Sequence, residues 1–519
     1  MALGSNGCVP RLLFRQRGSI PYAGTFRQPK ARFVGRRYNS TGGASVESVA
    51  AASATKPPSR RLRKVLIGTS VVLVFGTGYL YATDTRASAH RWIIPPLVRW
   101  LYPDAEDAHH AGVDALKLSY RFGFHPRERG NPDGTGDLVT QVFGYTLTNP
   151  IGISGGLDKD ADIPSPLFEL GPAIVEVGGT TPLPQEGNPR PRVFRLPSQE
   201  ALINRYGLNS KGADYMAAVL KQRVRDFAYS EGYGASETAE RRVLDGEAGV
   251  PPGSLLEGKL LAVQVAKNKA TPDNDIEAVK DDYVKCVDKL GKYADILVVN
   301  VSSPNTVGLR QFQQAEPLTI ILKGVVDSAH RTDRKTKPKV MVKVSPDEDS
   351  DADISGICDA VWASGVDGVI VGNTTKKRLD PLPQGYALPA REQATLKETG
   401  GLSGPQLFDN TIFLVAKYRT HLDERLQPKA AETTPDEAGT PIEPADAGVT
   451  PALPSGEAKP APTPKVIFAS GGISTGKQAQ QALDAGASVA MLYTGMIWGG
   501  AGTVTRIKEE MRDIRSGKQ

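Results

Sequence analysis

The chain has 519 residues, of which 39% are hydrophobic and 23% are charged, a composition that fits a globular protein of one large domain or two to three ordinary ones. Its net charge of +6 is unevenly spread, because residues 1–64 hold ten Arg, three Lys and one acid, which leaves the remainder at −6. This distribution argues against nucleic-acid binding by the folded part, and three widely spaced cysteines argue against a disulfide framework or a zinc site.

Residues 1–46 have the composition of a mitochondrial transit peptide. They contain no acid, and seven Arg are spread among Ser, Thr and Gly. Such a segment is normally removed from the mature protein; a disordered basic arm is the alternative. Residues 47–64 are interpreted as a linker that ends in the basic run Arg60–Lys64.

Residues 65–83 carry no charge and predict a transmembrane helix. Nineteen helical residues span about 28 Å at ~1.5 Å per residue, which roughly matches the hydrocarbon core of a bilayer. A buried helix of a soluble domain is the alternative. If the basic flank stays in the matrix, the helix crosses the mitochondrial inner membrane once and the C-terminal part faces the intermembrane space.

Residues 88–122 predict two short helices broken near Pro103, a small N-terminal module. Trp92 and Trp100 belong to an apolar surface that is too large for this module to hide by itself. Beside a membrane anchor, it would lie on the bilayer and admit a lipid-soluble ligand; packing on the main domain is the alternative. A protein shortened to begin near Ala87 is expected to keep its catalytic domain.

Residues 138–519 alternate strand-like and helical patterns, which predicts an α/β fold, a (β/α)8 TIM barrel. The eight strand-like runs are Gly152–Ser154, Ile174–Val177, Leu261–Val265, Ile296–Val301, Val340–Val344, Gly368–Val371, Val466–Ala469 and Val489–Leu492. Two tracts interrupt the pattern. Residues 230–257 predict a loop insertion, and residues 427–463, almost purely Pro, Ala, Glu, Thr and Gly, predict a disordered one.

The run Val298–Thr306 ends the fourth strand with two Asn, two Ser and a Pro. The carboxyl ends of barrel strands carry the active site in this fold. Asn300 and Asn305 both donate and accept hydrogen bonds, which suits a flat ligand rich in amides. Ser303 is a candidate proton acceptor with no His partner nearby; a polar turn that caps a helix is the alternative.

Other strand ends also carry polar or glycine-rich runs. Ser154–Lys159 allows a close backbone approach and offers a charge to an anion. Lys343 lies inside an apolar strand, where a charged side chain needs a reason. Contact with an anionic cofactor or a position on a solvent-facing edge would explain its presence. Ser470–Ser474 and Tyr493–Gly495 follow the last two strands, the usual phosphate site of such barrels. A phosphorylated cofactor is therefore expected, with no Walker loop, no nicotinamide fingerprint and no metal cluster.

Several long motifs resemble dihydroorotate dehydrogenase. They are Asn149–Gly152, Leu157–Lys159, Gln185–Arg192, Asn204–Gly207, Asn300–Asn305, Glu398–Gly404 and Tyr493–Thr494. The resemblance is to the class 2, membrane-associated, quinone-reducing mitochondrial form, and it covers about residues 88–228 and 258–510 apart from the insertions. It implies oxidation of (S)-dihydroorotate to orotate in the fourth step of pyrimidine (UMP) synthesis, with FMN as hydride acceptor and ubiquinone as final acceptor.

The resemblance also implies roles for single residues. Ser303 would remove the C5 proton, where class 1 enzymes use Cys, and Lys343 would stabilise the reduced flavin. The substrate would be held by Lys159, Asn204, Arg205, Tyr206, Gly207, Leu208, Asn300, Asn305, Asn373 and Thr374. FMN would be held by Ser154, Gly155, Gly156, Leu157, Asp158, Gly179, Asn268, Asn300, Lys343, Gly372, Gly404, Gly472, Tyr493 and Thr494. His109 and Arg195 match polar positions of the family's quinone tunnel.

The chain departs from the family at a few positions. Gly179 stands where many relatives have Ser, Gly372 where many have Thr, and Ser154-Gly155 replaces an Ala-Ala pair. The base and the asparagines are kept. Two alternatives stay open: a flavin barrel that acts on another pyrimidine or reduces fumarate or a nicotinamide, and a membrane-anchored scaffold without activity. The serine base and the anchor favour quinone, and the intact ligand positions argue against a scaffold.

Overall fold

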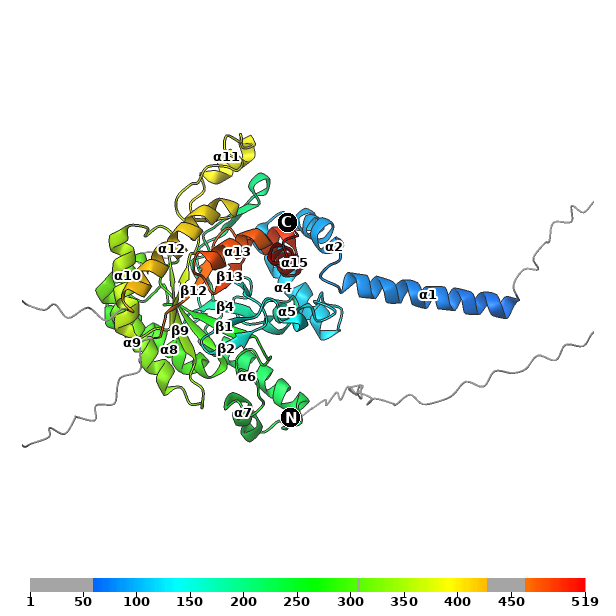
Figure 1. Ribbon diagram of the computed structural model, residues 1–519, viewed down its shortest axis with the longest axis horizontal. Coiled ribbons are helices and arrows are strands. Elements are labelled where there is room, and N and C mark those ends of the chain that lie inside the picture. Colours follow the sequence, from blue (N-terminus) through cyan, green and yellow to red (C-terminus); the bar gives the residue numbers. More distant parts are fainter. Residues whose placement is uncertain (1–58, 306–308, 427–462, 519) are drawn as a thin grey trace, which may run out of the picture. The chain divides into compact units, whose positions relative to one another are not determined.

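A computed structural model describes residues 59–305, 309–426 and 463–518. Eight parallel strands form a closed barrel in which each strand pairs with the next along the chain and the last pairs with the first (Figure 1). These strands are β3 (Ile151–Ile153), β4 (Ile174–Thr180), β7 (Leu260–Val265), β8 (Ile296–Asn300), β9 (Lys339–Val344), β10 (Gly368–Val371), β12 (Val466–Ser470) and β13 (Val489–Leu492). The predicted barrel is confirmed.

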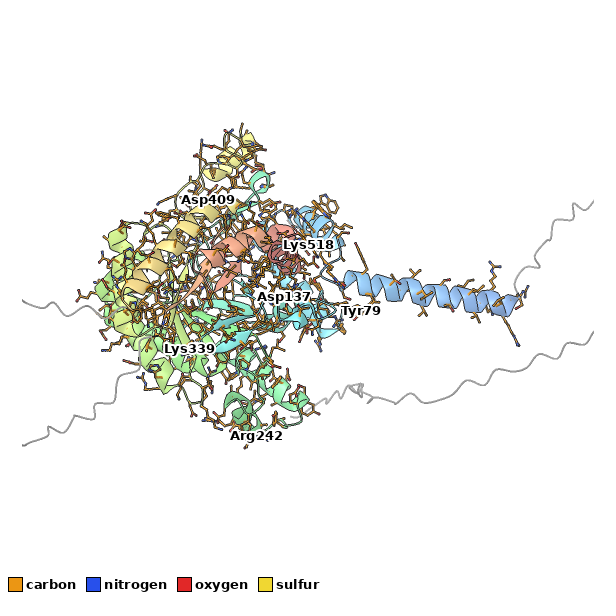
Figure 2. The ribbon with its side chains drawn as sticks, viewed as in Figure 1. Tyr79, Asp137, Arg242, Lys339, Asp409 and Lys518 are labelled. Atoms are coloured by element: carbon orange, nitrogen blue, oxygen red, sulfur yellow. The ribbon has the colours of Figure 1, made fainter. Side chains whose placement is uncertain are left out.

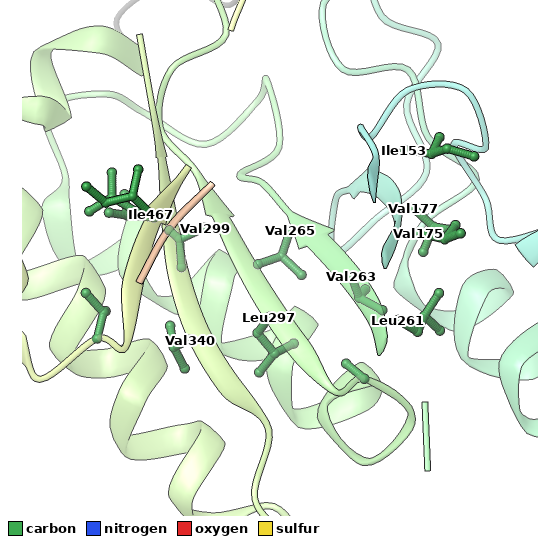
Figure 3. Packing of buried hydrophobic residues seen from close by; sticks show 14 of the residues in the cluster. Ile153, Val175, Val177, Leu261, Val263, Val265, Leu297, Val299, Val340 and Ile467 are labelled. Carbon is green, nitrogen blue, oxygen red and sulfur yellow. The ribbon is translucent and has the colours of Figure 1, made fainter. Parts of the chain in front are cut away.

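Helices surround the barrel and cover its outer face. They are α5 (Pro164–Glu169), α6 (Ala213–Ser230), α8 (Ile276–Leu290), α9 (Ala315–Arg331), α10 (Asp351–Ser364), α12 (Phe408–Glu424), α13 (Gly476–Asp484), α14 (Thr494–Gly499) and α15 (Thr503–Arg515). Figure 3 shows β-branched and leucine side chains, such as Val263, Val265 and Leu297, that form the buried cluster between strands and helices. Fully buried strands of this composition are typical of parallel sheets.

The two faces of each strand follow the period of two that β structure imposes. Ala262, Val298 and Met341 belong to an apolar cluster separate from the one between strands and helices, and it fills the interior of the barrel. Two residues further along these three strands, the same interior face carries Gln264, Asn300 and Lys343 instead. The interior is therefore apolar below and polar at the carboxyl ends of the strands, where a ligand cavity opens.

Two smaller sheets complete the fold. The hairpin β1 (Thr140–Val142) and β2 (Tyr145–Leu147) is antiparallel. A three-stranded sheet has the order β11–β6–β5, built from β5 (Val193–Leu196), β6 (Ala201–Asn204) and β11 (Gly401–Ser403). Its strand β5 packs against α11 (Ala390–Leu396). This second sheet supplies residues to the cavity that no barrel strand supplies.

The chain divides into two compact units within its first helix, between Ile67 and Gly68. Of the first unit, the structure describes only residues 59–67, which include the start of that helix. Helix α1 (Arg60–Ala82) has no buried residue, and among the described residues it is the one helix long and apolar enough to cross a membrane. The predicted transmembrane segment is therefore helical. The transit peptide expected over residues 1–46 lies outside the described residues.

Three helices rather than two follow α1: α2 (Ala89–Trp92), α3 (Ile94–Leu101) and α4 (Ala105–Arg121). The break near Pro103 is where it was expected, and Asp104 caps α4 through the backbone N–H groups of Glu106 and Asp107. Trp92 is 68% exposed and Trp100 is 76% exposed. Helices α2 and α3 contact α14 of the barrel, and the module still leaves a large apolar face uncovered. Its place on the bilayer stays a prediction.

The tract 230–257 differs from the loop predicted for it. It contains helix α7 (Glu237–Leu244), whose Val243 is fully buried against α6. Ser236 caps this helix, and Glu240 forms an ion pair with Arg225 of α6. Its polar composition concealed a two-turn amphipathic helix that needs only one apolar stripe to pack. Most of the other tract, residues 427–462, lies outside the described residues.

Candidate active site

One cavity lies at the carboxyl ends of the barrel strands, and most of the predicted site residues line it. The lining residues that the sequence predicted are Ser154, Gly155, Gly156, Lys159, Gly179, Asn204, Tyr206, Gly207, Leu208, Asn300, Ser303, Asn305, Lys343, Asn373, Thr374, Gly404, Gly472, Tyr493 and Thr494. They come from almost every barrel strand end and from the three-stranded sheet. The fold thus brings together residues that lie up to 340 positions apart in the sequence.

A polar layer crosses the barrel interior beneath the cavity. Lys343 on β9 lies opposite Asn300 on β8 in the strand register. Its ammonium forms an ion pair with Glu176 on β4, at 3.0 Å between Nζ and Oε2. Gln264 on β7 donates to Glu176 Oε1 at 2.5 Å, and its own Oε1 accepts from Asn300 Nδ2 at 2.8 Å. Four strands are therefore joined by one hydrogen-bonded chain.

The chain of hydrogen bonds continues to the neighbour of the candidate base. Asn300 Oδ1 accepts from the Ser302 backbone N–H at 3.1 Å and from its hydroxyl at 3.2 Å. The same hydroxyl accepts from Asn373 Nδ2 at 2.9 Å. Ser303 lines the cavity, 8% exposed, while Ser302 is fully buried behind it. The structure therefore distinguishes two adjacent serines, one held in the network and one facing the ligand space.

Asn204 and Asn305 meet at the side of the cavity. Asn305 Nδ2 lies 3.3 Å from Asn204 Oδ1, and the Asn305 carbonyl accepts from Asn188 Nδ2 at 3.2 Å. Asn204 ends β6, so the three-stranded sheet closes over the barrel here. Thr306, the last residue of the run that begins at Val298, lies outside the described residues.

Lys159 is a half-buried cation at the same cavity. Its ammonium donates to Asn209 Oδ1 at 2.9 Å and lies 3.8 Å from the centre of the Tyr206 ring. Burial lowers the pKa of Lys159 to about 8, and the nearby charge of Arg192 acts in the same direction. No ion pair of Lys159 is found among the residues that the structure describes. It therefore offers a positive charge that an anionic ligand can neutralise.

Arg192 connects this cation to the N-terminal module. Its guanidinium makes a buried ion pair with Glu106 of α4, at 2.7 Å, and lies 5.2 Å from the centre of the Tyr206 ring. Tyr206 is thus in contact with two cations. Buried pairs of this kind fix geometry because removal of either partner leaves a buried charge.

The loops after β12 and β13 form a glycine-lined end of the cavity. Gly472 has a φ of +71°, and a Cβ atom there would lie 2.5 Å from the backbone nitrogen of Phe408. Gly495 is equally crowded, since a Cβ would lie 2.9 Å from the carbonyl oxygen of Ile473. Thr494 Oγ1 and Ser403 Oγ are 2.9 Å apart. Backbone N–H groups exposed by such turns favour an anion.

Five predicted ligand residues do not line the cavity. Arg205 turns away to an ion pair with Glu398 at 2.7 Å. The carboxylate of Asp158 accepts from the backbone N–H groups of Asp162 and Ile163, and burial raises its pKa to about 7. Leu157 packs against the core. None of these three residues lines the cavity, and their roles in binding stay predictions.

The remaining two are Asn268 and Gly372. Asn268 hydrogen-bonds both backbone groups of Leu183 and lies in a separate surface hollow, so its assignment as a cofactor ligand disagrees with its position. Gly372 has a φ of +114°, and a Cβ would collide with the carbonyl of Ser470. The absence of a threonine side chain at this position is therefore a requirement of this backbone.

The two expected quinone-tunnel residues lie where the N-terminal module meets the barrel, outside the cavity lining. Arg195 donates to the carbonyl of Pro103 at 2.7 Å, between α3 and α4. Burial lowers the pKa of His109 to about 4, and the charge of Lys159 adds to this effect. His109 is therefore neutral and close enough to Lys159 to sense its charge.

Glu176 and Gln264, the two residues that join Lys343 to Asn300, were not among the predicted site residues. Strand periodicity could have identified both, because each lies two positions after an interior apolar residue, as Lys343 and Asn300 do. Three further residues line the cavity without being predicted, and none of them directly follows a barrel strand: Glu200, Ser403 and Trp498. Among the described residues no group of three or more His, Cys, Asp or Glu is arranged to hold a metal ion.

Comparisons with known proteins give a consistent result. A family model described as dihydroorotate dehydrogenase matches residues 137–427 and 463–514. The mitochondrial dihydroorotate dehydrogenase (quinone) of Candida glabrata is 34% identical over 456 residues, which cover 86% of this chain and 88% of that protein. The mouse protein of the same name is 33% identical, over 88% of this chain and 94% of that protein. A crystal structure of the enzyme from Eimeria tenella with ferulenol is 30% identical, covers 80% of this chain and 93% of that chain, and has a TM-score of 0.59.

Proposed function

This chain belongs to the dihydroorotate dehydrogenase family, and we propose how its site oxidises dihydroorotate to orotate with a quinone as the electron acceptor. The observation that carries the proposal is one cavity that unites Ser303, the cation Lys159, four asparagines and the glycine-lined loops. The relatives named above are called quinone enzymes, so they lend no support to fumarate or a nicotinamide as acceptor.

The cavity fits FMN, the flavin we propose as cofactor. The glycine loops at Gly472 and Gly495, beside Thr494, line the cavity and suit a phosphate group, and the polar layer at Lys343 and Gln264 suits the edge of a flavin ring. Gly155, Gly156, Gly179, Gly404 and Tyr493 would complete the binding site. When bound, FMN takes up a hydride from the substrate and returns the electrons to the quinone.

The residues of this chain would bind dihydroorotate and remove its proton. Lys159 would bind the carboxylate, and Asn204, Asn300, Asn305, Asn373 and Thr374 would hold the ring amides. Ser303 is the proposed base for the C5 proton, because its side chain lines the cavity without being part of the buried network. A hydroxyl is a weak base, so a closed site that passes the proton onward is needed.

The N-terminal part would bring the enzyme to its quinone. The apolar helix α1 and the mitochondrial relatives point to anchoring in a mitochondrial membrane. We propose that this is the inner membrane and that the catalytic part faces the intermembrane space, because the basic flank precedes the helix. The exposed aromatic residues of α2 and α3 would lie on the bilayer. Ubiquinone would pass between these two helices toward His109 and Arg195.

The acceptor assay tests this function directly. The purified full-length protein is expected to show flavin absorbance and to reduce a short-chain ubiquinone when dihydroorotate is added. Fumarate and NAD⁺ are expected to give rates at least tenfold lower. A colourless protein, or equal rates with all three acceptors, would rule out the proposed reaction.

Truncation tests which part of α1 belongs to the folded enzyme. Tyr79, Thr83 and Thr85, which a protein that begins at Ala87 would lack, hydrogen-bond to residues further along the chain. Tyr79, labelled in Figure 2, donates to the carbonyl of Gly123 at 2.9 Å, and Arg129 donates to Thr83 Oγ1 at 2.6 Å. Thr85 Oγ1 lies 2.8 Å from Thr505 Oγ1.

A protein that begins at Gly78 is therefore expected to keep the flavin and the rate with a soluble dye, and to need less detergent. A protein that begins at Ala87 is expected to melt several degrees lower, since it loses three hydrogen bonds, one buried and two partly buried, worth about 1 kcal/mol each. The two melting temperatures, measured side by side, decide the point. Equal melting temperatures would mean that residues 78–86 are dispensable.

A further inference from the structure

Glu176 is a fully buried carboxylate that the reaction described above does not use. It lies on β4 behind the cavity and is 0% exposed. Its two oxygens accept hydrogen bonds from three strands: from the Gly155 backbone N–H after β3 at 2.7 Å, from Gln264 on β7, and from Lys343 on β9. A buried carboxylate is costly unless it is paired and fully hydrogen-bonded, and here it is both.

The two lysines that line the cavity differ in whether they have a counter-ion. Lys343 has Glu176 as its counter-ion, whereas Lys159 has no ion pair among the described residues. Lys159 is thus free to neutralise an anionic ligand that enters from outside. Lys343 and Glu176 together carry no net charge, so this pair suits a ligand that is neutral when it binds.

Glu176 also fixes the direction of the neighbouring amides. A carboxylate only accepts hydrogen bonds, so Gln264 must turn its NH₂ group to Glu176 and its oxygen to Asn300. Asn300 in turn directs its oxygen to Ser302. The groups of Lys343 and Asn300 that remain for a ligand are therefore N–H donors.

We propose that Glu176 is a positioning residue that aims Lys343 and offsets its charge, and that it thereby lowers the reduction potential of the bound flavin. The inference rests on the proposed function, because it requires a flavin beside Lys343. The oxidised flavin ring is neutral and the reduced ring is anionic. An unpaired lysine would favour the reduced ring, and a negative charge about 3 Å from that lysine, in an interior of low dielectric constant, opposes this effect.

The test is the midpoint potential of the flavin in the holoenzyme, compared with E176Q and with E176D as the matched control. E176Q keeps the size of the side chain and removes its charge, whereas E176D keeps the charge and shortens the chain. E176Q is expected to bind reduced flavin at least tenfold more tightly relative to oxidised flavin. For a two-electron couple this is a positive shift of about 30 mV or more. E176D is expected to stay closer to the native potential.

The outcomes separate this inference from the proposed function. A native protein without flavin contradicts the function itself. A native holoenzyme whose potential equals that of E176Q, or a shift as large in E176D as in E176Q, overturns the role of Glu176. Loss of flavin from both variants also overturns it, because it indicates packing alone. Loss of flavin from E176Q with retention in E176D supports it, since the charge of the side chain then matters more than its length.

Discussion

Replacing Ser303 with alanine is expected to lower the rate of flavin reduction by dihydroorotate by about 10²–10⁴-fold, the usual contribution of a general base. Ser303 lines the cavity together with the asparagines, and its neighbour Ser302 is fully buried. In the proposed site, other residues would bind the carboxylate and ring amides of the ligand. The affinity for orotate is therefore expected to change by less than about threefold.

Single-turnover reduction of the flavin in a stopped-flow instrument measures the rate, and a titration of the oxidised enzyme with orotate measures binding. The matched control is S303C, which keeps a group able to take up a proton and is expected to retain more of the rate than S303A. A reduction rate of S303A near the native value would rule out Ser303 as the base. A large loss of orotate affinity would instead indicate that the hydroxyl binds the ligand.

The barrel and most of the cavity follow from local sequence patterns. Each strand is a short β-branched run, and the polar or glycine residues after it necessarily reach one end of a parallel barrel. This is why Asn300, Asn373 and Tyr493 could be placed at a common site without any knowledge of their contacts. The same logic correctly ordered all eight strands.

The partners within the site did not follow from local patterns. Glu176 and Lys343 are 167 positions apart, and only closure of the barrel brings their strands across from one another. Asn268 shows the opposite error: it follows β7, but the chain has already turned outward there, and its amide serves the Leu183 loop. Gln264 is the last interior position inside β7, two residues after Ala262, whereas Asn268 lies three residues beyond the end of this strand. Alternation counted within the strand, and stopped at its end, would therefore have favoured Gln264 over Asn268.

The largest effect on ligand binding is expected at Lys159. In K159M the carboxylate of orotate would enter a buried site without its counter-charge, because no ion pair of Lys159 is found among the described residues and Arg192 is already bound to Glu106. Truncation of one partner of a buried charged pair costs about 2–5 kcal/mol, so the dissociation constant of orotate should rise about 30-fold or more. K211M, which removes an exposed lysine already paired with Asp162, is the matched control and should bind orotate normally.

The same residue predicts the pH dependence of binding. Burial lowers the pKa of Lys159 to about 8 in the free protein, with Arg192 acting in the same direction and Asp160 and Glu106 opposing it. Orotate binds the protonated form, so its affinity should be constant below about pH 8 and should fall about tenfold per pH unit above it. Titrations at pH values on both sides of that pKa measure this directly. K159M should bind weakly with no such break, because it lacks the titrating group. A break of the same size in K159M would assign the titration to another residue and remove Lys159 from the carboxylate site.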